Sequence, residues 1–167
     1  MGLIIAIDPG CTESGYVVVR HDENEITQVV DKGKVENKEI YSVMNQYLAY
    51  DLAIEMVACY GMPVGAEIFD TCVWIGQFLR EANTRKLARK IKLIYRKEEK
   101  LNLCGTPAAK DANIVQALID RYAYGQPNKG KGTKKQPGFF YGFAKDVWQA
   151  MAVAVTYFDL YGKNENS

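Results

Sequence analysis

The amino-acid sequence predicts a single α/β domain whose core is a mixed five-stranded sheet covered by helices. Three short apolar runs of strand length open the chain, and the first two lie so close together that an antiparallel hairpin is their natural connection. Later apolar runs alternate with segments whose apolar residues have helical spacing, which is typical of strands joined by helices. A length of 167 residues fits one domain.

The predicted elements follow one another in chain order. We expect strands at residues 3–7, 15–19, 26–35, 52–57 and 91–95, and helices at residues 39–50, 71–88, 107–124 and 144–161. Asp8-Pro9-Gly10 is a turn signal that ends the first strand, and Pro107 suits the first turn of a helix. Residues 125–142 are rich in glycine, proline and lysine and lack periodicity, so we expect a flexible basic loop there.

The composition excludes several classes of protein. Apolar residues make up 48% and charged residues 25%, as in an ordinary globular domain, which excludes disorder and coiled coil. The apolar runs are far shorter than the roughly 20 residues of a membrane span, and the N-terminus has no secretory signal pattern. The four cysteines form no C-x-x-C pair and there is one histidine, so we expect no zinc site, free thiols and a cytoplasmic location.

Charge is unevenly distributed along the chain. The formal net charge is only +1, but residues 1–79 carry 4 basic and 12 acidic groups, and residues 80–146 carry 16 basic and 6 acidic groups. This separation favours one face that binds a polyanion, of which nucleic acid is the commonest. The alternative is two solvated faces of opposite sign.

Three carboxylates stand where charge is costly. Asp8 ends the first strand, Glu55 lies inside the fourth, and Asp146 lies near the start of the last helix. If the first and fourth strands are neighbours, Asp8 and Glu55 meet and repel each other unless a proton or a cation is present. Hard oxygen ligands of this kind suit Mg²⁺ or Mn²⁺. Asp8 as a turn residue and Asp146 as a helix-start charge are the simpler alternatives.

Four ordered motifs resemble those of the RuvC-type Holliday junction resolvases. The opening Ile7-Asp8-Pro9-Gly10 with Gly15-Tyr16 resembles the first motif, and Ala53-Ile54-Glu55, followed by Ile75-Gly76-Gln77, resembles the second. The third region is similar to Leu103-Cys104-Gly105-Thr106 with Lys110 and Val115, and the closing helix is similar to the segment from Asp146 to Thr156. The match covers nearly the whole chain.

The resemblance implies a ribonuclease-H-like fold, with the five-stranded mixed sheet flanked by helices on both faces in one nuclease domain over residues 1–167. It also implies a homodimer that resolves four-way DNA junctions by paired nicks, leaving 5′-phosphate and 3′-hydroxyl ends. Asp8, Glu55 and Asp146 then have the catalytic and metal-ligand roles, with two Mg²⁺ per active site and Mn²⁺ able to substitute. No partner helicase can be named from the sequence.

Two positions depart from the family pattern. Gln149 stands where the family has a fourth carboxylate, and its amide oxygen is a further candidate ligand, without charge. The alternative supplier of the missing charge is one of Glu67, Asp70 and Asp120. Ala58 stands where the family has a base-stacking aromatic; the nearby Tyr60 could replace it or be an ordinary loop or core residue.

Basic residues cluster in a stripe within residues 80–100 and in the loop at residues 129–135, both suited to phosphates. The predicted DNA-binding residues are Tyr60, Arg80, Arg85, Lys86, Arg89, Lys90, Lys110, Arg121, Lys129, Lys131, Lys134 and Lys135.

Other functions compete with junction cleavage. A branched-DNA-binding protein with weak or lost catalysis is suggested by Gln149, and a ribonuclease H acting on RNA–DNA hybrids has similar chemistry. An actin-like or sugar-kinase ATPase shares the opening Asp-x-Gly pattern, but such enzymes close two lobes around ATP and need about twice this length.

Overall fold

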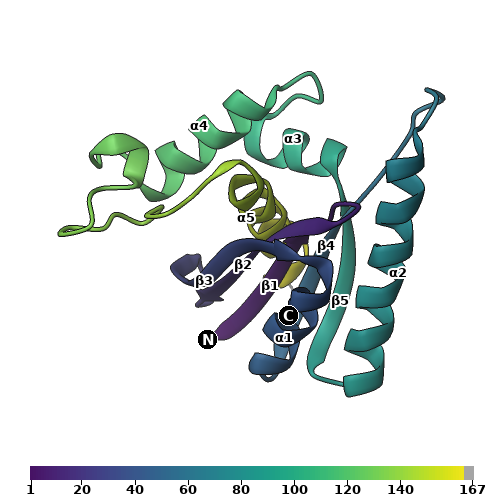
Figure 1. Ribbon diagram of the computed structural model, residues 1–167. Helices are drawn as coiled ribbons and strands as arrows, with labels where there is room; N and C mark the ends of the chain where they lie inside the picture. Colours follow the sequence, from purple (N-terminus) through teal and green to yellow (C-terminus); the bar gives the residue numbers. More distant parts are fainter. Residues whose placement is uncertain (164–167) are drawn as a thin grey trace.

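The computed structural model describes residues 1–163 and has a five-stranded mixed sheet at its centre (Figure 1). The strands are β1 (Gly2–Asp8), β2 (Glu13–His21), β3 (Ile26–Glu36), β4 (Tyr50–Met56) and β5 (Ala88–Tyr95). Their order in the sheet is β3-β2-β1-β4-β5, with β2 antiparallel to its neighbours and β4 parallel to β1 and β5. The predicted α/β class and sheet are confirmed.

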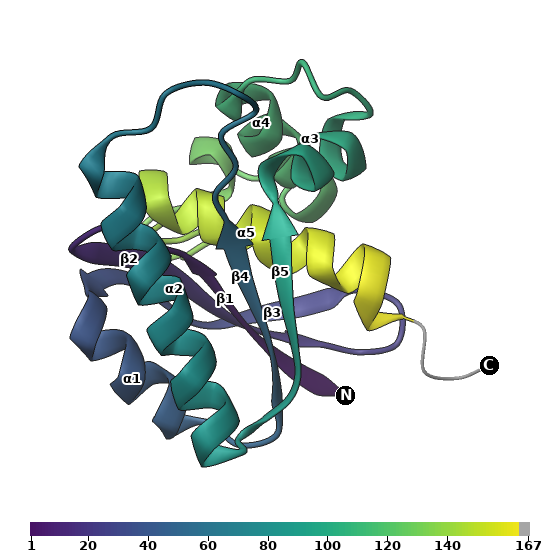
Figure 2. The same ribbon diagram turned by 90° about the vertical axis from the view of Figure 1, so that its right-hand side faces the viewer.

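Helices cover both faces of this sheet (Figure 2). They are α1 (Asn37–Gln46), α2 (Ala66–Arg85), α3 (Arg96–Cys104), α4 (Asp111–Tyr122) and α5 (Lys145–Tyr157), with a short 3₁₀ turn at Asn128–Gly130 and a π-helical turn at Phe158–Gly162. The alternation of side chains in β1 explains the two layers. Ile5 and Ile7 pack with α1 and α2, whereas Ile4 and Ala6 pack with α4 and α5.

The predicted C-terminal ends of two helices are wrong, because each predicted range runs into residues that form a strand. The helix expected at residues 39–50 ends at Gln46, because Tyr50 is fully buried and pairs with Leu3 as the first residue of β4. The helix expected at residues 71–88 begins at Ala66 and ends at Arg85, where Lys86 adopts a left-handed conformation that stops it. In both places pairing within the sheet overrides local helical spacing.

Helix α3 was not predicted. Its sequence is mostly charged, so it has little apolar periodicity to signal a helix. It begins directly where β5 ends, and the Glu98 carboxylate accepts a hydrogen bond from the Tyr95 backbone N–H at 2.8 Å across its first turn. The next helix, α4, starts at Asp111, not at Pro107 as expected.

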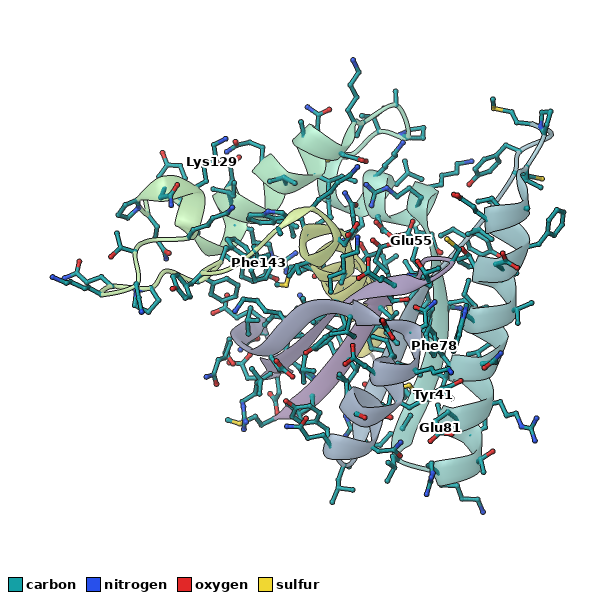
Figure 3. The ribbon with its side chains drawn as sticks, in the orientation of Figure 1. Tyr41, Glu55, Phe78, Glu81, Lys129 and Phe143 are labelled. Carbon is teal, nitrogen blue, oxygen red and sulfur yellow. The ribbon has the colours of Figure 1, made fainter. Side chains whose placement is uncertain are left out.

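The basic segment at residues 125–142 is anchored by aromatic side chains. Phe140 and Phe143 are buried and pack against Trp148 of α5 in tilted and edge-on arrangements, with ring centroids 4.6 Å and 4.9 Å away. Figure 3 shows Phe143 beneath this segment and Lys129 on its outer side. The flexibility expected here stays a prediction, and the anchors fix where the segment rejoins the core.

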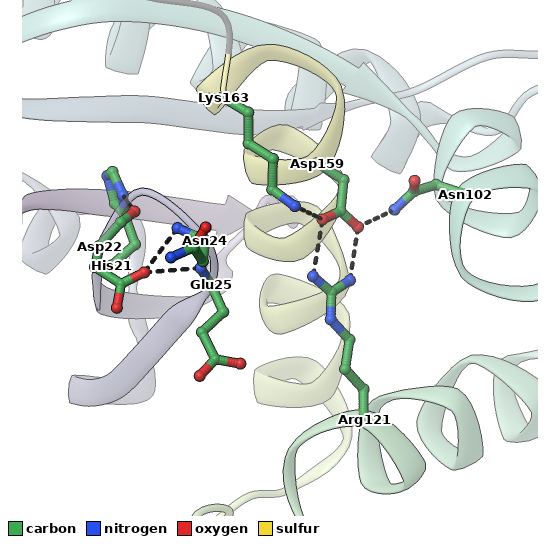
Figure 4. Close-up of polar contacts among 8 residues, drawn as sticks. All are labelled: His21, Asp22, Asn24, Glu25, Asn102, Arg121, Asp159 and Lys163. Atoms are coloured by element: carbon green, nitrogen blue, oxygen red, sulfur yellow. Dashed lines mark hydrogen bonds and ion pairs between the residues drawn. The ribbon is translucent and has the colours of Figure 1, made fainter. Parts of the chain in front are cut away.

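A polar junction joins the end of the chain to the helical layer (Figure 4). The Arg121 guanidinium donates to both carboxylate oxygens of Asp159, at 2.7 Å and 2.9 Å, and Asn102 donates to the same carboxylate at 2.9 Å. This contact ties α3 and α4 to the turn that follows α5.

Among residues 1–163, no helix is long and apolar enough to cross a membrane.

Candidate active site at the carboxyl ends of the strands

Asp8 and Glu55 lie side by side at the carboxyl ends of two adjacent parallel strands. Ile7 pairs with Ile54 in the register of β1 and β4, so the next residue of each strand is a carboxylate. Because side chains alternate along a strand, Asp8 shares the face of Ala6, and Glu55 shares the face of Ala53. Both carboxyl groups therefore point toward the α5 layer.

Asp146 reaches the same place from the first turn of α5. Helix α5 approaches β2 so closely that a Cβ on Gly15 would lie 2.5 Å from the Asp146 carbonyl oxygen, so only glycine fits there. The Asp146 carboxylate is held by the Lys34 ammonium of β3 at 2.8 Å. Asp8, Lys34 and Asp146 line one surface hollow together with Gly15 and the turn after β1.

That turn is fixed by buried side chains. The Asn37 amide donates to the Gly10 carbonyl oxygen at 2.9 Å, and the Ser14 hydroxyl donates to the Asn37 side-chain oxygen at 2.5 Å. The Gly10 backbone N–H in turn donates to Ser14 Oγ at 3.2 Å. The backbone after Asp8 is thus held rigidly, and the sequence analysis did not identify Ser14 or Asn37 as support for the site.

The carboxylates are crowded in a low-dielectric environment. Burial, followed by the charges of Glu55 and Asp146, raises the pKa of Asp8 to about 8. Burial and the charge of Glu99 raise the pKa of Glu55 to about 8. Asp8 and Glu55 also share a side-chain hydrogen bond, which requires one proton between the two carboxyl groups. Burial and mutual repulsion of the two groups therefore favour a proton or a cation between them.

Glu99 is a fourth carboxylate of this cluster, and the sequence analysis missed it. It lies on α3 and is fully buried, and its Oε2 accepts a hydrogen bond from Arg96 at 2.6 Å. Arg96 also forms an ion pair with Asp111 at the start of α4. Glu99 stands in a run of charged residues, and its place beside Glu55 arises only because β5 pairs with β4 and delivers α3 to this edge.

The other candidate carboxylates have different surroundings. Glu67 and Asp70 are exposed on the first turns of α2, and Asp120 is exposed on α4, where it accepts a hydrogen bond from Gln116. Gln149 lies one turn after Asp146, and its Oε1 is buried with no hydrogen-bond partner among the described residues.

The residues present fit a hard divalent cation. The donors are carboxylate and amide oxygens, the kind that Mg²⁺ and Mn²⁺ prefer. One oxygen of Glu99 and one of Gln149 are buried without a partner, and the Asp8–Glu55 pair needs a positive charge or a proton. Within residues 1–163, no three acidic, histidine or cysteine side chains surround a single metal position; Asp146 is turned toward Lys34 and Glu99 toward Arg96.

The predicted DNA-binding residues fall into two regions. The stripe formed by Arg80, Arg85, Lys86, Arg89 and Lys90 lies along the second half of α2 and the start of β5, at the opposite end of the sheet from Asp8 and Glu55. Figure 3 shows Glu81, the ion-pair partner of Arg85, at the far end of α2 from Glu55. Since α2 has 20 residues, it is about 30 Å long. The structure does not bring this stripe to the carboxylates.

The remaining basic residues lie on the other face of the sheet from α2, around α4 and the segment that follows it. Lys110 precedes α4, and Lys129, Lys131, Lys134 and Lys135 lie on the basic segment. Arg121 has its guanidinium engaged by Asp159, so its role in DNA binding stays a prediction. Tyr60 is 71% exposed in the turn after β4, so it is not a core residue. Its stacking on a base stays a prediction.

Taken together, the sheet order, the two helical layers and the carboxylates at the strand ends define a ribonuclease-H-like α/β fold. Solved structures bear this out. The chain is similar to a Thermus thermophilus RuvC in complex with a Holliday junction substrate, with a TM-score of 0.71 and 15% sequence identity over 98% of this chain and 96% of that one. A second Thermus thermophilus RuvC structure gives a TM-score of 0.68 and 16% identity, over 96% and 97% of the two chains.

These similarities establish the fold of a Holliday junction resolvase for this chain, and they confirm at that level the resemblance read from its motifs. No family model matches the sequence, and no curated protein matches it.

Proposed function

We propose that this protein is a metal-dependent, structure-specific DNA endonuclease that resolves four-way junctions by paired nicks. The observation that carries the proposal is the meeting of Asp8 and Glu55 at adjacent strand ends with Asp146 facing them from α5. A buried group of like charges costs folding free energy, so its retention favours a catalytic purpose over a structural one. The neighbour's Holliday junction complex indicates the class of substrate.

Asp8, Glu55 and Asp146 are the residues that would hold Mg²⁺ or Mn²⁺, two ions per site, with the Gln149 amide oxygen as a neutral donor. When bound, such ions activate a water for in-line attack on a phosphodiester and stabilise the leaving 3′ oxygen, giving 5′-phosphate and 3′-hydroxyl ends. The chain itself supplies a dry, rigid frame. Lys34 holds the Asp146 carboxylate at 2.8 Å, and the Ser14–Asn37 contacts hold the turn after Asp8.

The DNA path that we propose crosses the carboxyl-end edge of the sheet. The basic segment rejoins the core at Phe143, just before Asp146, and Lys110 precedes α4; both carry exposed lysines that suit phosphates. Tyr60, exposed at the other end of the edge, is suited to stack on an unpaired base. The stripe on α2 would contact junction arms far from the cut.

A homodimer is part of the proposal. The exposed side of α2 and the preceding loop carry an apolar stripe that solvent would not favour, comprising Met62, Val64, Phe69 and Val73. Phe69 and Val73, 62% and 58% exposed, are one helical turn apart and so share a face. A two-fold pairing through this stripe would present one active site to each of two strands of a junction, which itself has near two-fold symmetry.

A cytoplasmic location is also part of the proposal, because the four cysteines are free thiols, which suit a reducing compartment.

Cleavage of labelled substrates by the purified protein tests the proposal. We expect Mg²⁺-dependent paired nicks in a four-way junction, little cleavage of linear duplex and none of an RNA–DNA hybrid. Asp8→Asn is the matched inactive control. Tight junction binding without cleavage in either Mg²⁺ or Mn²⁺ would favour the branched-DNA-binding alternative, and preferential cleavage of the hybrid would favour a ribonuclease H.

A further inference from the structure

Glu99 is a buried carboxylate of which only one oxygen has a hydrogen-bond partner among the described residues. Its side chain is fully buried, one oxygen accepts a hydrogen bond from Arg96 at 2.6 Å, and Oε1 has no hydrogen-bond partner among the described residues. A buried carboxylate oxygen without a partner is costly, and native proteins keep such a group mainly where a ligand, an ion or a water completes it. The free oxygen of Glu99 therefore points to something that binds there.

The position of α3 gives Glu99 access to the carboxylate cluster. Glu55 pairs with Ile94 and Met56 with Tyr95, so β5 ends level with the carboxyl end of β4. Helix α3 begins at the next residue and brings Glu99 onto its first turn. Among the charges that act on Glu55, that of Glu99 is the largest, and Asp8 acts on Glu99 in turn.

Gln149 provides the complementary observation from α5. It follows Asp146 by three residues, so both side chains lie on the same side of the helix. Its Oε1 is also buried without a partner among the described residues, and it has no charge to offer a cation. The site thus has a neutral oxygen on α5 and an additional carboxylate on α3.

Resting on the proposed function above, we propose that Glu99 is the fourth carboxylate of the metal centre, and that it supplies from α3 the charge that Gln149 lacks on α5. Arg96 is then a positioning residue. Its guanidinium holds Oε2 of Glu99 and is itself braced by Asp111, which leaves Oε1 as the free donor. A purely structural ion pair between α3 and α4 needs only Arg96 and Asp111, and it does not account for a buried acid with a free oxygen.

Mn²⁺ binding without DNA tests this inference independently of cleavage. Calorimetric titration of the full chain with Mn²⁺ gives the affinity, and thermal unfolding in chelator confirms that each variant is folded. We expect Glu99→Gln to weaken Mn²⁺ binding about 10- to 100-fold, the range typical when a group that supports a metal site is removed. Glu98→Gln is the matched control, because it makes the same substitution one residue away, where the carboxylate binds Tyr95 and Tyr161. It should change the affinity less than twofold.

A double-substitution cycle separates charge supply from general destabilisation. In the Glu99→Gln background, Gln149→Asp should recover most of the lost affinity, whereas Gln149→Asp alone should give no gain, because it crowds a cluster that is already complete. Unchanged Mn²⁺ affinity in Glu99→Gln, or a tenfold gain from Gln149→Asp alone, would overturn the role of Glu99 while leaving the metal site intact.

Failure of the proposed function has a different signature. If the wild-type chain binds no Mn²⁺, or if Asp8→Asn binds it as tightly as wild type, the metal centre itself is refuted and Glu99 loses its role with it. The Asp8→Asn titration thus distinguishes the two failures.

Discussion

The proton shared by Asp8 and Glu55 makes the stability of the metal-free protein depend on pH in an unusual direction. Burial and neighbouring charges raise the pKa of both groups to about 8, whereas in the unfolded chain they titrate near 4. Between these values the folded state holds a proton that the unfolded state has released, so the free energy of unfolding falls as pH rises. Carboxylates that form ion pairs with basic groups in the folded state have the opposite effect on stability.

Asp8 and Glu55 form one interacting pair, and for the single proton that they share the free energy of unfolding falls by about 1.4 kcal/mol per pH unit. From about pH 5 to pH 8 the loss is about 4 kcal/mol, equivalent to a fall in Tm of about 8–16 °C for a chain of this size. Asp8→Asn removes the Asp8 contribution and reduces the effect, because the asparagine amide can donate to the Glu55 carboxylate without a titrating proton, whereas the burial of Glu55 and the charge of Glu99 remain. The variant should be more stable than wild type at pH 8 and similar at pH 5.

Thermal and urea unfolding in chelator across this pH range measure both proteins. Mg²⁺ added at pH 8 should restore much of the wild-type stability and have little effect at pH 5, where the ligands are protonated. A wild-type stability that is flat or rises from pH 5 to pH 8, or a variant that follows the wild type in parallel, would refute the shared proton and the crowding that we infer from the structure.

Three further predictions concern cleavage, DNA binding and folding. Asp8→Asn should abolish junction cleavage and leave binding equal or tighter, because a negative charge near the phosphates is removed; gel assays with near wild-type cutting would exclude the metal role of Asp8. Charge reversal at Arg85, Lys86 and Arg89 of the α2 stripe should weaken binding to all DNA shapes alike. It should also lower the slope of log K against log salt by about 0.9 per lost contact. Cleavage at saturating DNA should be unchanged, because the stripe is remote from the carboxylates. Burial raises the pKa of Asp159, but hydrogen bonds from Arg121 and Asn102 outweigh it and lower the value, so this junction stabilises the fold above the unfolded pKa and is lost on acidification. Asp159→Ala should cost about 2–3 kcal/mol near neutral pH by urea unfolding, and a loss below 0.5 kcal/mol would show that the contact is incidental.

The opening motif shows how much of the site the sequence contains. The uninterrupted apolar run at residues 3–7 indicates a strand buried on both faces, and the alternation of side chains along a strand puts Asp8 on the same face as Ala6. The structure explains the glycine at position 15, because α5 packs where a Cβ on this residue would collide with the Asp146 backbone. Asp8, Glu55 and Asp146 were predicted as partners because each lies where charge is costly; the structure places Asp8 beside Glu55 at adjacent strand ends, and Asp146 lines the same hollow as Asp8.

Some features depended on contacts between distant parts of the chain. Where α1 ends and β4 begins was decided by the pairing of Tyr50 with Leu3, against a helical pattern that continued through residue 50. Arg121 was read as a cation for DNA, yet its guanidinium faces Asp159, which lies 38 residues away in the sequence.

The sequence by itself determined the fold class and predicted three acids of the candidate site, because these inferences depend on local periodicity and on residue types that are costly to bury. Only the tertiary structure makes Glu99 the candidate for the fourth acid, because it buries this side chain where its charge acts on Glu55. Its segment is a charged run like any surface helix, and what makes it different is the parallel pairing of β5 with β4, which delivers α3 to the carboxyl end of the sheet. Strand register and packing join residues that no local window contains, so the burial of Glu99 beside Glu55 follows from the assembled sheet alone.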